Sequence, residues 1–289
     1  MYVICYPQGG WNDMMSRIWY CQEYCMKTKR KLIIDTTKNW FRDDIYHYVN
    51  FTLPNLLKPK NQSEFITSLY KTESVFPAEM KGLDNENIPP IIWKAPGHME
   101  TSTGIIVSTR LDQLYKENVI VYADCGSSIN INPILCYTKF LPFVLNCVKE
   151  RYESLPKGYS SVHIRNTDYK SDLDSFINKN NFTFSNTALF VASDNYKTID
   201  LFINKYGAYS FSNIPKVSEG SNIHESQESQ ELRKSIENIR EFNRDTIADF
   251  LLLAAGSTFY FSSKQSGFSR SIFYLNQERG LVKWLLPFV

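Results

Sequence analysis

The stretch that decides the fold is Ser161-Val162-His163-Ile164-Arg165-Asn166-Thr167-Asp168-Tyr169. Val162 and Ile164 alternate with polar residues, which predicts a β-strand with one buried side. Arg165 and Asp168 follow at the end of that strand, where ligands bind in an open α/β sheet. An arginine there presents a planar fork that suits phosphate oxygens. The alternative is an Arg–Asp pair that only ties a loop.

The composition indicates a globular protein with a substantial core. The 289 residues are 43% hydrophobic and 15% aromatic, which excludes global disorder. A net charge of +2 gives no indication of nucleic-acid binding through bulk charge. No stretch approaches the roughly 20 apolar residues that span a bilayer, and the first residues lack the pattern of a signal peptide. We therefore expect a cytoplasmic protein with no integral membrane segment. The six cysteines form no Cys-x-x-Cys motif, so we expect reduced thiols and no metal site.

Strands and helices alternate along the chain, which predicts a mostly parallel sheet in each of two halves. The break at Pro156-Lys157-Gly158 divides an N-terminal domain, 1–155, from a C-terminal domain, 156–289. The first half is predicted to contain strands at 2–6, 31–35 and 118–123 and helices at 12–27 and 137–153. The second is predicted to contain strands at 160–165, 188–193 and 258–262 and helices at 172–178, 196–205, 245–255 and 267–276. Residues 40–115 show no clear pattern, and the polar stretch 218–230 is predicted to be an exposed loop.

The first strand is followed by a glycine turn, Gly9-Gly10-Trp11-Asn12-Asp13. Paired glycines permit a sharp turn and a close approach to the backbone, and the helix that follows presents free N–H groups. The turn lacks the Gly-x-Gly-x-x-Gly pattern of nicotinamide dinucleotide sites. Asp13 is a candidate general base at this strand end, and its alternative role is to cap the helix.

Two further strands also end in polar residues. Asp194 follows the strand 188–193 and either holds a ribose or base edge or caps the next helix. The loop 262–270 is rich in hydroxyl groups and begins a helix, an arrangement that suits a diphosphate. Asp249 is the acid most expected to face inward on the helix before it. Because polar groups at the ends of parallel strands converge, the three clusters together favour a nucleotide site.

These motifs, in this order, resemble those of the fucosyltransferase-like superfamily, which includes the nodulation, core α1,6- and α1,2-fucosyltransferases and the protein O-fucosyltransferases. The three C-terminal motifs correspond to 163–168, to 191–194, and to Asp249 with the loop 263–269. The turn 9–13 is similar to the Gly-x-x-Gly-Asn or Gly-x-x-Gly-Asp turn that opens the family's N-terminal domain. The resemblance covers both halves, although residues 40–115 match none of its motifs.

The resemblance implies a GT-B glycosyltransferase, an α/β protein in which two Rossmann-like domains face each other across a cleft. The nucleotide sugar is then a substrate held by the C-terminal domain, no cofactor or metal is required, and the acceptor is a hydroxyl of an oligosaccharide or other glycan. The donor-binding residues that the resemblance implies are Gly9, Gly10, His163, Asp168, Asp194, Asp249, Ser263, Ser266, Gly267 and Phe268.

In the family's mechanism Arg165 would neutralise the diphosphate as it leaves. His163 and Asp249 would contact the base or ribose, Asp194 the nucleoside, and residues 266–268 the phosphates and base. If the reaction inverts the anomeric carbon, a base on the N-terminal domain would take the acceptor proton. Asp13 is the first candidate for that base, and residues 43–44, both aspartate, are weaker ones.

Core fucosyltransferases carry two consecutive arginines, whereas Asn166 stands at the second position here. GDP-fucose is therefore one expected donor, and a UDP-sugar such as UDP-xylose is nearly as well supported. The alternative function is a non-catalytic glycan-binding protein on a degenerate transferase fold. The retained set of His163, Arg165 and Asp168 argues against it, because a lectin has no use for a diphosphate site. A nucleotide-dependent hydrolase ranks lower, since a Walker A loop is missing.

Overall fold

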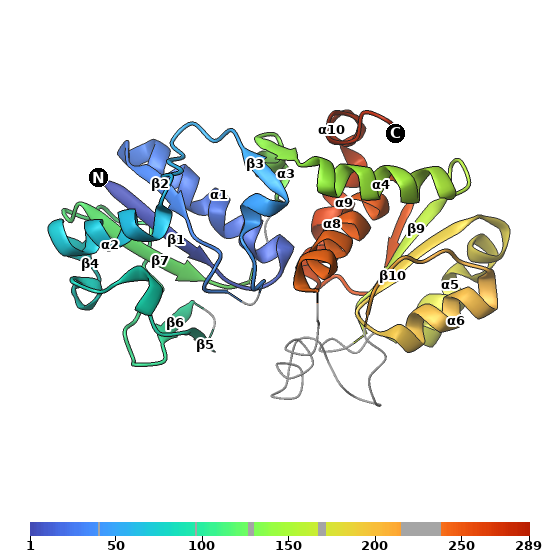
Figure 1. The fold of residues 1–289 in the computed structure, drawn as a ribbon. Coiled ribbons are helices and arrows are strands. Elements are labelled where there is room, and N and C mark those ends of the chain that lie inside the picture. Colours follow the sequence, from blue (N-terminus) through green and yellow to red (C-terminus); the bar gives the residue numbers. More distant parts are fainter. Residues whose placement is uncertain (40, 96, 127–129, 167–171, 215–237) are drawn as a thin grey trace. The chain divides into compact units, whose positions relative to one another are not determined.

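The computed structural model describes residues 1–39, 41–95, 97–126, 130–166, 172–214 and 238–289. The chain divides into two compact units, Met1–Lys139 and Phe140–Val289 (Figure 1). Each unit is built on its own parallel sheet. Among the described residues, no helix combines the length and the hydropathy that crossing a membrane requires.

The first unit contains a sheet of four strands in the order β2-β1-β7-β4. Its bounds are β1 Tyr2–Pro7, β2 Lys31–Ile34, β4 Val75–Phe76 and β7 Val119–Asp124. All three pairings are parallel, so the carboxyl ends of the strands lie at one edge. Both central strands are almost wholly buried, as expected for a sheet that helices cover on two faces.

Helices pack on both faces of this sheet. On one face, Ile4 and Tyr6 of β1 join a cluster with residues of α2 (Gln62–Thr72). On the other, Cys5 contacts Cys21 of α1 (Trp11–Thr28), which packs along β1. Successive side chains of β1 thus point to opposite faces of the sheet, where they pack on α2 and on α1 in turn.

Shorter elements complete the first unit. They are η1 Ile45–His47, β3 Val49–Phe51, η2 Ala78–Met80, η3 Asn85–Asn87, β5 Ile91–Ala95, β6 His98–Thr101 and α3 Asn132–Leu135. The strands β5 and β6 form an antiparallel hairpin, and β3 pairs with β8 (Thr138–Phe140), which reaches the boundary between the units.

The second unit has a three-stranded parallel sheet in the order β10-β9-β11. Its elements are α4 Pro142–Ser154, β9 Ser160–Ile164, α5 Leu173–Asn186, β10 Leu189–Ser193, α6 Tyr196–Tyr206, α8 Ile239–Ala255, β11 Phe259–Phe261, α9 Gly267–Gln277 and α10 Arg279–Leu285. Val162 and Ile164 of β9 pack with α5 and α6, whereas Ser161 donates to the carbonyl oxygen of Leu253 in α8 at 2.6 Å. Helices therefore lie on both faces of this sheet (Figure 1).

Most predicted elements are confirmed, and three differ. The helix predicted at 137–153 is the strand β8 followed by α4, because Pro142 is pre-set for the first turn of a helix. Both α5 and α8 are longer than predicted. The predicted loop 218–230 lies outside the described residues.

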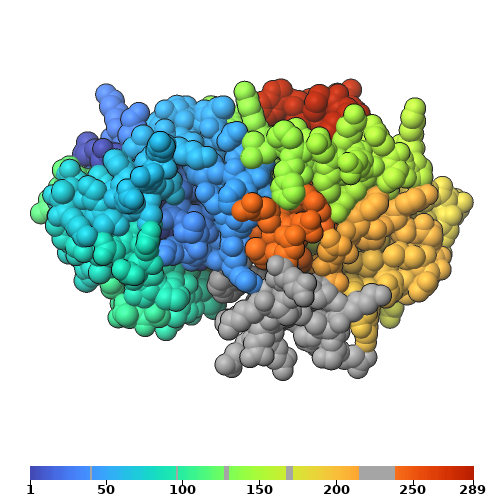
Figure 2. Space-filling model, in the orientation of Figure 1, coloured from blue at the N-terminus to red at the C-terminus, as the bar shows by residue number. Residues whose placement is uncertain are grey.

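The units divide before α4, whereas the sequence predicted a boundary after it, at 155/156. Helix α4 belongs to the second unit because Val144 and Val148 are buried and Arg151 reaches α8. On its opposite face, Lys149 and Glu153 are exposed. Figure 2 shows atoms of α4, in yellow-green, on the surface.

The turn after β1 depends on Gly9. Its φ angle is +94°, and a Cβ atom added there would lie 2.8 Å from Asp13 Oδ2 and 3.0 Å from Cys125 Sγ. We predict that Gly9→Ala lowers the free energy of unfolding by about 1–3 kcal/mol, measured by urea denaturation. Gly10→Ala is the control, because nothing lies within 4 Å of its Cβ position. Equal losses in the two variants would contradict this account of the turn.

Candidate functional site

Three strand ends of the second unit bring polar residues together. Ile164 of β9 is in register with Ser193 of β10, so the residues that follow them, Arg165 and Asp194, are neighbours. His163 is in register with Phe261 of β11. The next residue, Ser262, therefore reaches the same edge. This is the place where open α/β sheets bind ligands.

The guanidinium of Arg165 is held by Asp194. Arg165 Nε lies 3.1 Å from Asp194 Oδ2, and the two side chains are only 15% and 8% exposed. The backbone N–H of Arg165 donates to Ser262 Oγ at 3.1 Å. The alternative that Asp194 caps α6 is wrong, because Asn195 caps it by accepting from the Thr198 N–H at 3.2 Å. Asp194 at the end of β10 thus holds the guanidinium of Arg165, and Ser262 after β11 holds its backbone.

Asn166 follows Arg165 at the end of β9. Its backbone N–H donates to Asp194 Oδ1 at 2.9 Å, and its amide donates to Thr198 Oγ1 at 3.2 Å. The side chain therefore helps to fix the strand end and adds no charge. Asp168, predicted to belong to this site, lies outside the described residues, as does Thr167.

His163 contacts the first turn of α9. Its Nδ1 is 2.6 Å from Ser269 Oγ, and its ring is 5.0 Å from that of Phe268. Burial lowers the pKa of His163 to about 3, and the nearby positive charge of Arg165 adds to the effect. The imidazole is therefore neutral at physiological pH. In this form it positions α9 and offers hydrogen bonds without charge.

The loop before α9 presents backbone N–H groups at a helix N-terminus. Ser266 caps the helix by accepting from the Ser269 N–H at 3.2 Å, and Gly267 is the first helical residue. Ser263 Oγ accepts from the Gln265 N–H at 3.2 Å, which shapes the loop. Hydroxyls, a helix N-terminus and Arg165 together form an arrangement that suits an anion.

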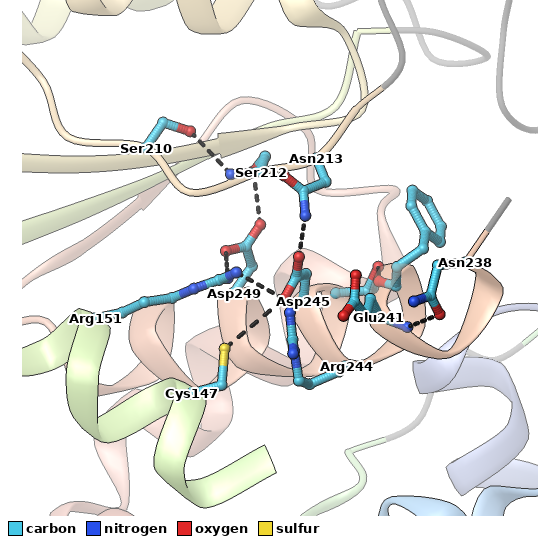
Figure 3. Close-up of polar contacts among 12 residues, drawn as sticks. Cys147, Arg151, Ser210, Ser212, Asn213, Asn238, Glu241, Arg244, Asp245 and Asp249 are labelled. Carbon is cyan, nitrogen blue, oxygen red and sulfur yellow. Dashed lines mark hydrogen bonds and ion pairs between the residues drawn. The ribbon is translucent and has the colours of Figure 1, made fainter. Parts of the chain in front are cut away.

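Asp249 belongs to a different network, which ties α4 to α8 (Figure 3). Asp249 Oδ2 accepts from Ser212 Oγ at 2.6 Å, and its Oδ1 lies 3.5 Å from Arg151 Nη1. Arg151 also pairs with Asp245 at 2.6 Å, and Arg244 Nε donates to the same carboxylate at 3.0 Å. Burial raises the pKa of Asp249 to about 7, partly offset by Ser212 and Arg151.

The predicted residues of the N-terminal turn lie in the first unit. Gly10 precedes α1 as its N-cap, and its N–H donates to Asp13 Oδ2 at 3.4 Å. Of the two roles considered for Asp13, this contact is the one expected of a helix cap. Arg17, one turn further along, pairs with Asp124 Oδ2 at 3.0 Å.

Sequence reasoning missed the partners that hold the site. Ser269 was detectable, because it lies three residues after the capping Ser266, the spacing at which a backbone N–H donates to the side chain of an N-cap residue. Arg151 gave no such signal. Its partners Asp245 and Asp249 are distant in sequence, and only the packing of α4 on α8 brings them together.

Comparisons with known proteins identify the fold. No model of a protein family matches the sequence, and no curated protein matches it. Among solved structures, the fucosyltransferase NodZ from Bradyrhizobium superposes with a TM-score of 0.60 at 15% identity, covering 95% of this chain and 91% of that one. The chain has the fold of the fucosyltransferases.

Two other solved structures match the fold of this chain. NodZ alpha-1,6-fucosyltransferase soaked with GDP-fucose matches with a TM-score of 0.59 at 16% identity, over 95% of this chain and 92% of that one. POFUT1 in complex with GDP matches with a TM-score of 0.55 at 10% identity, over 96% of each chain. The α/β fold expected from the resemblance is confirmed, whereas the facing of two domains across a cleft stays a prediction.

The raised pKa of Asp249 makes stability depend on pH. Below about pH 4 the carboxyl is protonated in both the folded and unfolded chain, whereas between about pH 4 and 7 only the folded chain keeps the proton. The stabilisation by this proton is therefore lost as the pH rises through 7. We predict that the unfolding free energy of wild type relative to Asp249→Asn falls by on the order of 2–4 kcal/mol between pH 4 and 8.

Urea denaturation at pH 4, 6 and 8 measures this difference. The control is Glu153→Gln, which removes a carboxylate from the exposed face of α4 and should follow wild type. A constant difference between Asp249→Asn and wild type would contradict the assignment.

Proposed function

We propose that the protein is a glycosyltransferase that moves a sugar from a nucleoside diphosphate donor to a hydroxyl of a glycan. The observation that carries this proposal is the anchored Arg165 at the meeting point of three strand ends, beside the N-terminus of α9. The fold adds support, because NodZ and POFUT1 are known in complex with GDP or GDP-fucose. A glycan-binding protein would have no need of a cation held in this way.

Arg165 has the main role in the proposed mechanism. As the bond between the sugar and the diphosphate breaks, negative charge develops on the leaving phosphate. A guanidinium that Asp194 already orients stabilises this charge without reorganisation. Hydroxyls of residues 262–269 and the free N–H groups of α9 would bind the remaining phosphate oxygens.

The nucleoside would contact residues of β9, α8 and α9. His163 and Phe268, in contact with each other, offer a neutral hydrogen-bonding ring and an aromatic surface. Asp249 would bind the base or ribose, which requires its carboxyl to exchange Ser212 for the nucleoside. The carboxylate of Asp194 contacts Arg165 Nε and accepts from the Asn166 N–H, so its role in the proposed mechanism is to orient the guanidinium.

GDP-fucose and a UDP-sugar such as UDP-xylose are the two donors we propose. GDP-fucose is supported by the neighbours, since one of the matching structures is POFUT1 in complex with GDP-fucose. Asn166 in place of a second arginine leaves room for a different donor. We also propose inversion at the anomeric carbon, by direct attack of the acceptor hydroxyl opposite the nucleotide.

Calorimetric binding of GDP, UDP, CMP and their sugar conjugates tests the proposal. We predict that one diphosphate binds tightly and that Arg165→Ala weakens it by about a hundredfold or more, because the phosphate charge loses its partner. Arg165→Lys keeps the charge without the planar fork, and its affinity for the diphosphate should lie between those of wild type and Arg165→Ala.

The control is Arg110→Ala, which removes a guanidinium that is 79% exposed on the first unit. Thermal unfolding of each variant checks the fold, since Arg165→Ala leaves the Asp194 carboxylate without its partner. A folded protein that binds none of these nucleotides would overturn the proposal and favour the glycan-binding alternative.

We also predict that transfer persists after chelation of divalent metals. In the described part of the chain, no three His, Cys, Asp or Glu side chains are grouped to hold a metal ion. In the proposed mechanism a cationic side chain and a helix N-terminus do the work of a cation. Nucleoside diphosphate release measured with excess EDTA should match the untreated rate. Loss of activity that Mg²⁺ or Mn²⁺ restores would contradict this part of the mechanism.

A further inference from the structure

Arg151 links α4 to two carboxylates of α8. Its Nη2 lies 2.6 Å from Asp245 Oδ1, and its Nη1 lies 3.5 Å from Asp249 Oδ1. The side chain is only 14% exposed, and its guanidinium lies over the ring of Phe211, 5.4 Å from the ring centroid. Because an arginine stays charged throughout the physiological pH range, α4 brings a permanent positive charge to a buried side of α8.

The carboxylate of Asp249 lies between Arg151 and Ser212 (Figure 3). Its Oδ2 accepts from Ser212 Oγ at 2.6 Å. Its Oδ1 faces Arg151, and no described residue donates a hydrogen bond to it. The two oxygens therefore differ in their partners. One has a positive charge beside it, and the other has a neutral hydroxyl that an N–H or O–H of a ligand can replace.

Asp245 has a second cation besides Arg151. Arg244 contacts the same Asp245 oxygen through Nε at 3.0 Å and through Nη2 at 2.9 Å, and Asn213 donates to the other oxygen. Asp249 has no second cation, since in the described part of the chain Arg151 alone forms an ion pair with it. The contact between Arg151 and Asp249 is thus the one that no other described residue duplicates.

We infer that Arg151 is a positioning residue for the donor, which keeps Asp249 ionised and oriented while the nucleoside replaces Ser212. The inference rests on the proposed function, in which Asp249 binds the base or ribose. A base edge or a ribose meets a carboxylate with N–H and O–H donors, and these bind the ionised form more strongly than the neutral one. Without the charge of Arg151, burial would favour the protonated form of Asp249 still further.

The groups around Asp249 indicate how donor binding should depend on pH. Burial raises the pKa of Asp249 to about 7, and Arg151 opposes this rise. Burial also raises the pKa of the Cys147 thiol, so the thiol stays neutral, and Ser212 carries no charge. His163, elsewhere in the proposed site, has a pKa lowered to about 3. The charged or titratable groups of α4 and α8 in this network are Cys147, Arg151, Arg244, Asp245 and Asp249.

Asp249 is therefore the group expected to titrate near neutral pH. Below its pKa the nucleoside must displace the proton from the carboxyl, so the affinity for the donor should rise with pH. Above the pKa the carboxyl is already ionised, and the affinity should be constant. The midpoint of this change measures the pKa of Asp249 in the free protein.

Calorimetric titration with GDP-fucose and with UDP-xylose, from about pH 5.5 to about pH 8.5, tests the inference. Both phosphates of a nucleotide sugar are esterified, so neither takes up a proton in this range. In wild type the affinity should rise by up to about tenfold per pH unit and level off near pH 7. Arg151→Gln should move the midpoint upward by about 1–3 pH units, because a nearby opposite charge lowers the pKa of a carboxyl by that amount.

Two further variants of the network complete the test. Arg244→Gln is the matched control, because it removes a neighbouring cation that contacts Asp245, and its midpoint should equal that of wild type. Asp249→Asn should abolish the change in affinity with pH. Arg151→Lys keeps a charge that cannot bridge both carboxylates as the planar fork does, so it should move the midpoint upward by less than Arg151→Gln. Thermal unfolding checks the fold of each variant.

The outcomes distinguish this inference from the proposed function. A wild-type midpoint in folded Arg151→Gln, or in Arg151→Lys if the glutamine variant does not fold, overturns the role of Arg151. A loss of affinity by the same factor at every pH also overturns it, because a purely structural role gives that result. Wild-type affinity that does not change with pH, or changes equally in Asp249→Asn, overturns the inference and leaves the transferase standing. Wild-type protein that binds neither nucleotide sugar contradicts the proposed function itself, and this inference with it.

Discussion

The site depends on the register of β9, the central strand of the second sheet. This strand is bonded to β10 on one side and to β11 on the other, so its position along both neighbours is set by backbone hydrogen bonds. The pairing of Ile164 with Ser193 brings Arg165 beside Asp194. A slip by one residue would turn His163 toward α5 and α6 and send Val162 toward α9.

The ion pair at this edge constrains the residues around it. Arg165 and Asp194 are both largely removed from water, and either charge left alone there would be strongly destabilising. Asn166 adds hydrogen bonds without a further charge, which explains how the strand end keeps its shape with only one arginine. Asp249 is also removed from water. Burial favours its protonated form, and Arg151 offsets part of this effect.

Much of the fold was predictable because local patterns and tertiary contacts agree. Alternation of apolar and polar residues located β9, short apolar runs located β1 and β10, and a helical period located α1. Residues 40–115 were not predictable, because their strands are short and pair with distant segments, as β3 does with β8. The compact units divide before α4, whereas the predicted boundary follows α4. The prediction used a proline-glycine break, which marks a turn, whereas packing on α8 decides which unit this helix joins.

The sequence by itself determined which residues stand at the ends of strands, since alternation and turn residues are local properties of the chain. It therefore placed Arg165 and His163 at one strand end and Asp194 at another. Only the tertiary structure decided what each side chain meets: Arg165 is held by Asp194, His163 lies under α9, and Asp249 faces Arg151. These contacts join residues far apart in sequence, and strand register and helix packing, which act over the whole unit, set them.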